Sequence, residues 1–210
     1  MNPAGRRPRV RAVAILILVL ALLPAGCGGS DAPPKKLHGY ARVPSLEVGE
    51  VTLPDVAPGG ARSSAMRAAP NGLLLVYFGY TSCPDVCPTT MADLRAAFEQ
   101  LPRGLRDRVQ VGMVTVDPRR DTPRVLNSYL GHFFSSWRAL RTTDPTELAR
   151  AERAFQTTHR LGAKDAAGNY EVTHTSVVFA VDPAGRVRVE WPFGTKPDAI
   201  ASDLRAVLKG

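Results

Sequence analysis

The chain of 210 residues has little of several features that would define its class at once. It contains three cysteines, and its longest apolar run, Ala12–Leu23, is shorter than the roughly 20 residues of a comfortable transmembrane helix. Basic residues are scattered among acidic ones instead of forming a block, so the charge pattern gives no indication of nucleic-acid binding. No internal repeat is visible. These absences leave a single globular domain of ordinary composition as the expectation.

The first 26 residues predict a secretory signal peptide. Four arginines and no acidic residue come before or within this segment, the apolar run follows them, and small residues end it. The sequence Leu23-Pro-Ala-Gly-Cys27 resembles a bacterial lipobox, in which cleavage occurs before a cysteine that carries lipid. We therefore expect lipid attachment at Cys27, with an uncleaved signal anchor and plain secretion as the alternatives. The formal charge is +8, and loss of the four arginines would leave +4.

The rest of the chain predicts a linker and one domain. Residues 27–45 begin with the lipid-anchor cysteine and read as a flexible, Pro-containing linker, so the domain is expected on the extracytoplasmic side of the cell membrane. Residues 46–210 are enough for one domain with a full core. The predicted elements are strands at 73–78 and 109–116, helices at 84–100, 122–130 and 144–157, a hairpin of strands 176–181 and 186–191, and a helix at 196–208. This order predicts an α/β fold of the thioredoxin-like class (peroxiredoxin-like variant), with helices flanking a central sheet.

Two cysteines, Cys83 and Cys87, follow the first strand at the start of the first helix. Residues four apart on a helix have Cα atoms about 6 Å apart, within the range of about 4.4–6.8 Å that a disulfide tolerates. Two thiolates so placed could also bind one metal ion, and a helix N-terminus favours the thiolate form. A purely structural disulfide would close too small a loop to stabilise much. The pair therefore predicts a redox switch, a metal site or both.

Three separate motifs resemble the Sco/SenC family. They are the run from Phe78 to Pro88 with its Cys-x-x-x-Cys spacing, the run Val116-Asp-Pro-Arg-Arg-Asp-Thr-Pro123, and His174 ahead of the last hairpin. A thioredoxin-type oxidoreductase would show Cys-x-x-Cys instead. The resemblance covers about residues 46–210, and it implies a protein that assists assembly of the copper centre of cytochrome c oxidase.

The resemblance also implies roles for individual residues. Cys83, Cys87 and His174 are the implied ligands of one copper ion, Cu(I) or Cu(II), and Asp117 is implied in the outer shell of the site. Thiolate and imidazole are ligands that suit Cu(I), and three ligands leave an open edge through which a partner can take the metal. From spacing alone, a lone histidine such as His174 is more often a core or loop residue than a ligand, and Asp117 could equally be a turn residue before a proline. Asp121 is expected to help cap the next helix.

Three functions remain open from the sequence. The first is a membrane-tethered chaperone that delivers copper to the dinuclear CuA site on cytochrome c oxidase subunit II, with a separate copper donor protein as a possible partner. The second is a thiol–disulfide reductase in which Cys83 and Cys87 are the redox-active pair, supplied by a thiol reductant, and keep the oxidase cysteines reduced. The third, a peroxidase or redox sensor, is disfavoured because the chain lacks a Thr-x-x-Cys arrangement. His174 discriminates between the first two, since only a copper site needs it.

Overall fold

The computed structural model describes Met1 and residues 36–209. The predicted signal peptide, the lipid-attachment residue Cys27 and the first part of the predicted linker therefore lie outside the described residues. Among residues 36–209, no helix has the length and apolar character needed to cross a membrane.

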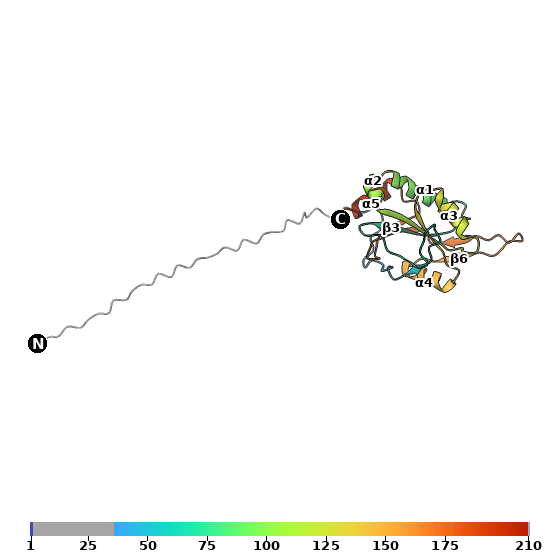
Figure 1. Cartoon of the computed structure of the whole chain (residues 1–210), viewed down its shortest axis with the longest axis horizontal. Coiled ribbons are helices and arrows are strands. Elements are labelled where there is room, and N and C mark those ends of the chain that lie inside the picture. Colours follow the sequence, from blue (N-terminus) through green and yellow to red (C-terminus); the bar gives the residue numbers. More distant parts are fainter. Residues whose placement is uncertain (2–35, 210) are drawn as a thin grey trace. The chain divides into compact units, whose positions relative to one another are not determined.

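A five-stranded sheet with the strand order β5-β4-β3-β8-β9 forms the centre of the fold (Figure 1). The strands are β3 (Leu73–Gly79), β4 (Val109–Thr115), β5 (Trp137–Leu140), β8 (Val177–Val181) and β9 (Val187–Pro192). β3, β4 and β5 run parallel, whereas β8 and β9 are antiparallel to their neighbours. Every residue of the central strand β3 is buried, which explains why its sequence is a continuous apolar run.

Helices cover both faces of the sheet. α1 (Val86–Glu99), α3 (Pro123–Gly131) and α5 (Pro197–Val207) lie on one side and α4 (Pro145–Phe155) on the other, while α2 (Arg103–Arg106) is a single short turn (Figure 1). α1 and α3 share a face because the crossovers β3–α1–β4 and β4–α3–β5 step in the same direction along the sheet and such crossovers are right-handed. On the opposite face, the ring of Phe155 in α4 packs against Phe78 and Phe179 at centroid distances of 5.2 and 5.1 Å.

The predicted fold class is confirmed as mixed α/β and thioredoxin-like. Two predicted helix starts are also found, because Thr122 accepts a hydrogen bond from the N–H of Val125 at 3.3 Å and Asp144 accepts one from the N–H of Thr146 at 2.8 Å. The sequence did not reveal five short strands: β5 and the two pairs β1 (Thr52–Leu53) with β2 (Ser64–Ala65) and β6 (His159–Leu161) with β7 (Val172–His174). All have only two to four residues, which is too short to produce a clear apolar pattern.

The packed region begins earlier than the boundary expected at residue 46. The backbone N–H groups of His38 and Gly39 donate to the buried carboxylate of Asp203 in α5, at 3.0 and 2.8 Å. Tyr40 then pairs with Glu190 of β9 through two backbone hydrogen bonds of 2.9 Å. The described end of the expected linker is thus bonded along the edge of the domain.

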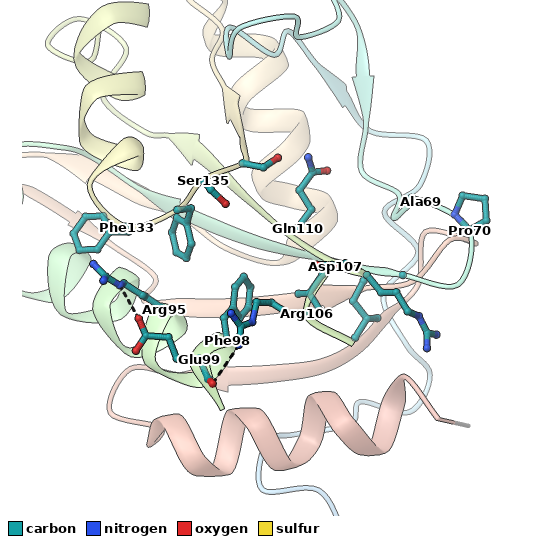
Figure 2. Close-up of a pocket in the computed structure, with 16 residues that line it drawn as sticks. Ala69, Pro70, Arg95, Phe98, Glu99, Arg106, Asp107, Gln110, Phe133 and Ser135 are labelled. Carbon is teal, nitrogen blue, oxygen red and sulfur yellow. Dashed lines mark hydrogen bonds and ion pairs between the residues drawn. The ribbon is translucent and has the colours of Figure 1, made fainter. Parts of the chain in front are cut away.

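A cavity of ≈ 590 Å³ lies at the end of the sheet where strands β3 and β4 begin. Figure 2 shows Phe98 and Phe133 facing it, with Arg95 paired to Glu99 on its rim. The cysteine pair follows the carboxyl end of β3, at the opposite end of the strands. The candidate site must therefore be recognised by its chemistry, because it does not coincide with this cavity.

Candidate metal centre

The loop between β3 and α1 carries the first cysteine and is held by a buried carboxylate. Asp121 accepts hydrogen bonds from the N–H and hydroxyl of Thr81 in this loop, at 3.1 and 2.5 Å, and from the hydroxyl of Thr115 at the end of β4, at 2.6 Å. Burial raises the pKa of Asp121, although these hydrogen bonds oppose the rise. The expectation that Asp121 caps the next helix is wrong. Thr122 is the cap, and Asp121 instead joins the cysteine loop to the neighbouring strand.

The three implied ligands converge. The sulfurs of Cys83 and Cys87 and a ring nitrogen of His174 all lie within 4.8 Å of one another. The Cys87 sulfur is 3.4 Å from Nε2 of His174, and the Cys87 N–H donates to the Cys83 sulfur at 3.4 Å. Both cysteines are free thiols. A metal with ligand distances of about 2.0–2.3 Å separates its donor atoms by roughly 3.3–4.0 Å, so a small contraction of this cluster would hold one ion.

The two thiols differ strongly in how easily they ionise. Cys87 is fully buried, and loss of hydration raises its pKa to about 12, although Tyr77 donates its hydroxyl to the sulfur at 3.6 Å. For Cys83, partial burial would also raise the pKa. Hydrogen bonds from the backbone N–H groups of Cys87 and Asp85 outweigh it, so the pKa of Cys83 is lowered overall. Cys83 is therefore the thiol that more readily becomes a thiolate.

His174 is oriented as a metal ligand would be. It ends the short strand β7, and its Nδ1 lies 3.2 Å from the carbonyl oxygen of Thr175, which only accepts hydrogen bonds. The ring proton is thus assigned to Nδ1, which leaves the lone pair of Nε2 directed at Cys87. The rings of Tyr77 and Tyr80 meet the imidazole edge-on, each at a centroid distance of 5.8 Å. Burial lowers the pKa of His174 and so favours the neutral ring that a metal requires.

Asp117 lies outside the ligand cluster. Its carboxylate is 1% exposed, accepts a hydrogen bond from the Tyr170 hydroxyl at 2.8 Å and forms an ion pair with Arg120. The Arg120 guanidinium lies over the ring of Tyr80, which in turn contacts His174. Asp117 is thus connected to the cluster only through intervening side chains.

Sequence reasoning missed the side chains that surround His174. Tyr77 and Tyr80 contact its ring, and His159 is its cross-strand partner in the β6–β7 hairpin. The position of both tyrosines in the run leading to Cys83 was the available signal, whereas nothing in the pattern placed His159 beside His174.

Comparison with known proteins agrees with this geometry. The model of the family SCO1/SenC matches residues 62–209. The chain belongs to the SCO1/SenC family. Among its relatives, the bovine (Bos taurus) protein named SCO2 homolog, mitochondrial, is 30% identical over 192 residues, which cover 88% of this chain and 70% of that protein. A protein of Stutzerimonas stutzeri is 36% identical over 134 residues, 64% of this chain and 65% of its own length. The match with bacterial relatives of this kind thus spans less than two thirds of their length.

Solved structures of this family have the same fold. The apo Sco1 protein from Thermus thermophilus is 30% identical, with a TM-score of 0.69 over 82% of this chain and 97% of that one. ScoI of Bradyrhizobium japonicum, solved with copper bound, is 27% identical, with a TM-score of 0.62 over 74% of this chain and 95% of that one. The fold that brings the three ligands together here is therefore one in which a relative holds copper.

Proposed function

We propose that this protein binds one copper ion through Cys83, Cys87 and His174 and delivers it to the dinuclear CuA site on subunit II of cytochrome c oxidase during assembly. The observation that carries this proposal is the convergence of two thiol sulfurs and one imidazole nitrogen within 4.8 Å. Membership of a family with a copper-bound member supports the choice of metal. A lipid on Cys27 would tether the domain to the extracytoplasmic side of the cell membrane, as the sequence alone suggests.

The donor set fits copper better than the harder biological metals. Thiolate and imidazole ligands suit Cu(I), whereas carboxylate and carbonyl oxygens suit Mg²⁺ or Ca²⁺. Within the described residues, the cluster of possible ligands has three members, and a structural zinc site would have four. An open position suits a metal that must pass to another protein.

The test of this function is a copper titration of the purified, fully reduced chain against a competing Cu(I) chelator. We expect one tightly bound copper per wild-type chain and at least about tenfold weaker binding by His174→Ala, since a lost ligand costs more than about 1.4 kcal/mol. His132→Ala is the matched control, because His132 is an exposed histidine at the end of α3 and outside the cluster. Full affinity in His174→Ala would contradict the three-ligand site.

Delivery requires a second measurement. Copper-loaded chain is mixed with the metal-free soluble fragment of subunit II, the two proteins are separated, and the copper in each is counted. The control replaces the copper-loaded chain with an equal concentration of Cu(I)–chelator complex at the same free copper concentration. Copper transfer to the fragment from the wild-type chain, but not from the chelator complex, supports the chaperone. Copper that stays on the chain would contradict it.

A thiol–disulfide reductase is the second candidate, and the unequal ionisation of the two free thiols favours it. A half-buried thiol with a lowered pKa beside a buried partner is the arrangement expected of an attacking and a resolving cysteine. Reduction of an oxidised subunit II fragment that disappears in Cys83→Ser but persists in His174→Ala would assign this activity.

A further inference from the structure

The hairpin that carries His174 is attached to the domain in an unusual way. In the part of the chain that the structure describes, β6 and β7 pair only with each other and not with the central sheet. Figure 1 shows this hairpin projecting from the body of the domain beside the label β6. His174 lies three residues before β8, but among residues 36–209 no strand-pairing hydrogen bonds to the central sheet fix the hairpin itself, so side chains that fasten the hairpin help to position His174.

One fastening lies at the base of the hairpin. Nδ1 of His159, the cross-strand partner of His174, lies 2.6 Å from the carboxylate of Glu152 in α4. This pair ties β6 to the helix, but it acts on the strand that does not carry the metal ligand.

A second fastening acts on the strand of His174 itself. Tyr170 lies two residues before β7, and burial alternates along 170–174 so that Tyr170, Val172 and His174 face inward. The Tyr170 hydroxyl donates to Asp117 at 2.8 Å, and Nη1 of Arg120 donates to the Tyr170 carbonyl oxygen at 3.1 Å. The Arg120 guanidinium also lies 4.0 Å from the centre of the Tyr170 ring and pairs with Asp117. Backbone, ring and hydroxyl of one hairpin residue are thus all held by the β4–α3 loop.

The same guanidinium reaches toward the metal cluster. Its central carbon lies 5.6 Å from the ring centre of Tyr80, and Tyr80 packs edge-on against His174. Arg120 thus contacts both Tyr170 of the hairpin and Tyr80 of the cysteine loop, and its flat guanidinium is well suited to contact two rings.

General stability is a poor explanation for this cluster. Asp117 is almost fully buried, and Nη2 of Arg120 is buried without a hydrogen-bond partner in the described part of the chain. An ion pair between a buried carboxylate and a partly exposed arginine with one unsatisfied nitrogen seldom contributes more stability than an apolar contact of the same size. A cluster of this kind is better suited to fixing a geometry than to adding stability.

We propose that Asp117, Arg120 and Tyr170 form a latch that holds the His174 strand against the cysteine loop and so keeps the copper ligands assembled. The three are positioning residues, since none touches the metal. The proposal rests on the copper site described above, and within it Asp117 orients Arg120 and Tyr170.

The test uses two measurements on the purified full chain. The first is hydrogen exchange in the metal-free protein, followed at amides of the hairpin, including that of Gly162, which bonds to the Glu171 carbonyl oxygen. The second is Cu(I) affinity against a chelator. Tyr170→Phe removes one oxygen atom and its bond to a charged group, and we expect about three- to tenfold faster hairpin exchange and weaker copper binding by a similar factor. Arg120→Ala should have a larger effect on both, and Arg120→Lys should restore little, since lysine cannot contact both rings.

Matched controls separate the latch from general damage. Arg124→Ala alters an exposed arginine of α3, and Tyr40→Phe alters an exposed tyrosine far from the latch in the sequence, so both should behave as wild type. Tyr170→Phe decides the matter if Arg120→Ala does not fold. Wild-type exchange in Tyr170→Phe, or faster exchange with unchanged copper affinity, would overturn the latch. If the proposed copper site itself were wrong, His174→Ala would bind Cu(I) with wild-type affinity. Hydrogen exchange would then still test whether the latch holds the hairpin.

Discussion

The unequal thiols make a prediction that can be tested without any metal. Iodoacetamide added to the reduced, metal-free chain at pH 8 should modify Cys83 long before Cys87. The reason is that only the thiolate is a nucleophile, and the two environments shift the thiol pKa in opposite directions, upward by burial for Cys87 and downward by backbone N–H groups for Cys83.

The size of the effect follows from these environments. A pKa of about 12 leaves Cys87 about one part in 10⁴ thiolate at pH 8, whereas a pKa below the ordinary value of 9.0 leaves Cys83 roughly a tenth or more in that form. This favours Cys83 by about 10³. Thiolates of lower pKa are weaker nucleophiles, which reduces this advantage by a factor of about 20–30, so a net rate ratio of about 30–50 in favour of Cys83 remains. The complete burial of Cys87 can only enlarge it.

The assay is a quenched time course in which mass spectrometry counts the modified forms of the peptides that carry each cysteine. Cys83→Ser provides the control, because Cys87 should stay slow in the absence of its neighbour. Alkylation of Cys87 at a rate equal to or above that of Cys83 would refute the assignment of Cys83 as the more reactive thiol. Modification of both at the unfolded rate would show that the site opens on the time scale of the reaction.

Three further predictions concern stability and attachment. Asp203 is buried, and burial alone would raise its pKa, but hydrogen bonds from the N–H of His38 and the indole of Trp191 lower the pKa overall. The ionised Asp203 therefore stabilises the fold above about pH 4, the pKa of an unfolded aspartate. This contribution is lost as the pH falls through the lowered pKa of the folded state. Asp203→Asn should cost about 2–4 kcal/mol at pH 7 and less at pH 3, as measured by urea unfolding at both pH values, and an equal cost at both would contradict this account. Gly79→Ala should destabilise by about 1–3 kcal/mol, because the added carbon would lie 2.5 Å from the Tyr77 ring, whereas Gly104→Ala, which meets nothing within 4 Å, should not. Cys27→Ser should release the chain from the membrane fraction without changing copper affinity, and a variant that remains in that fraction would favour an uncleaved anchor.

The parts of the fold that sequence predicted are those in which local pattern and tertiary environment agree. β3 is buried on both faces and reads as an unbroken apolar run, and α3 and α4 begin at a Thr-Pro and an Asp-Pro that serve as cap and first turn. The hairpin of β6 and β7 gave no such signal. Its strands have three residues each, and all residues from 160 to 169 are exposed. The pairing of the two strands therefore cannot be predicted from alternating apolar and polar residues.

The candidate site divides in the same manner. Cys83 and Cys87 are four residues apart, so their chemistry was visible in the sequence, and His174 was found through resemblance. The contact of Tyr170 with Asp117 joins residues 53 apart in the chain, and no sequence pattern around either residue predicts the contact. Such contacts are produced by topology, because β4 ends at the edge of the sheet where the hairpin emerges.

Copper binding and thiol redox chemistry at this site are opposing equilibria of one pair of sulfurs. Formation of the Cys83–Cys87 disulfide releases two electrons and two protons and requires the sulfurs to approach to about 2.05 Å, whereas a shared metal ion holds them roughly 4 Å apart. The disulfide has no thiolates and leaves His174 as the one remaining ligand of the cluster. Once free copper exceeds its dissociation constant, each further tenfold rise in copper concentration stabilises the reduced pair by about 1.4 kcal/mol. For this two-electron couple, that raises the reduction potential of the pair by about 30 mV. A chain loaded with copper would therefore resist oxidation and be a weaker reductant than the same chain without copper. The proposed chaperone and the proposed reductase would then be two occupancy states of one site, and the copper supply would select between them.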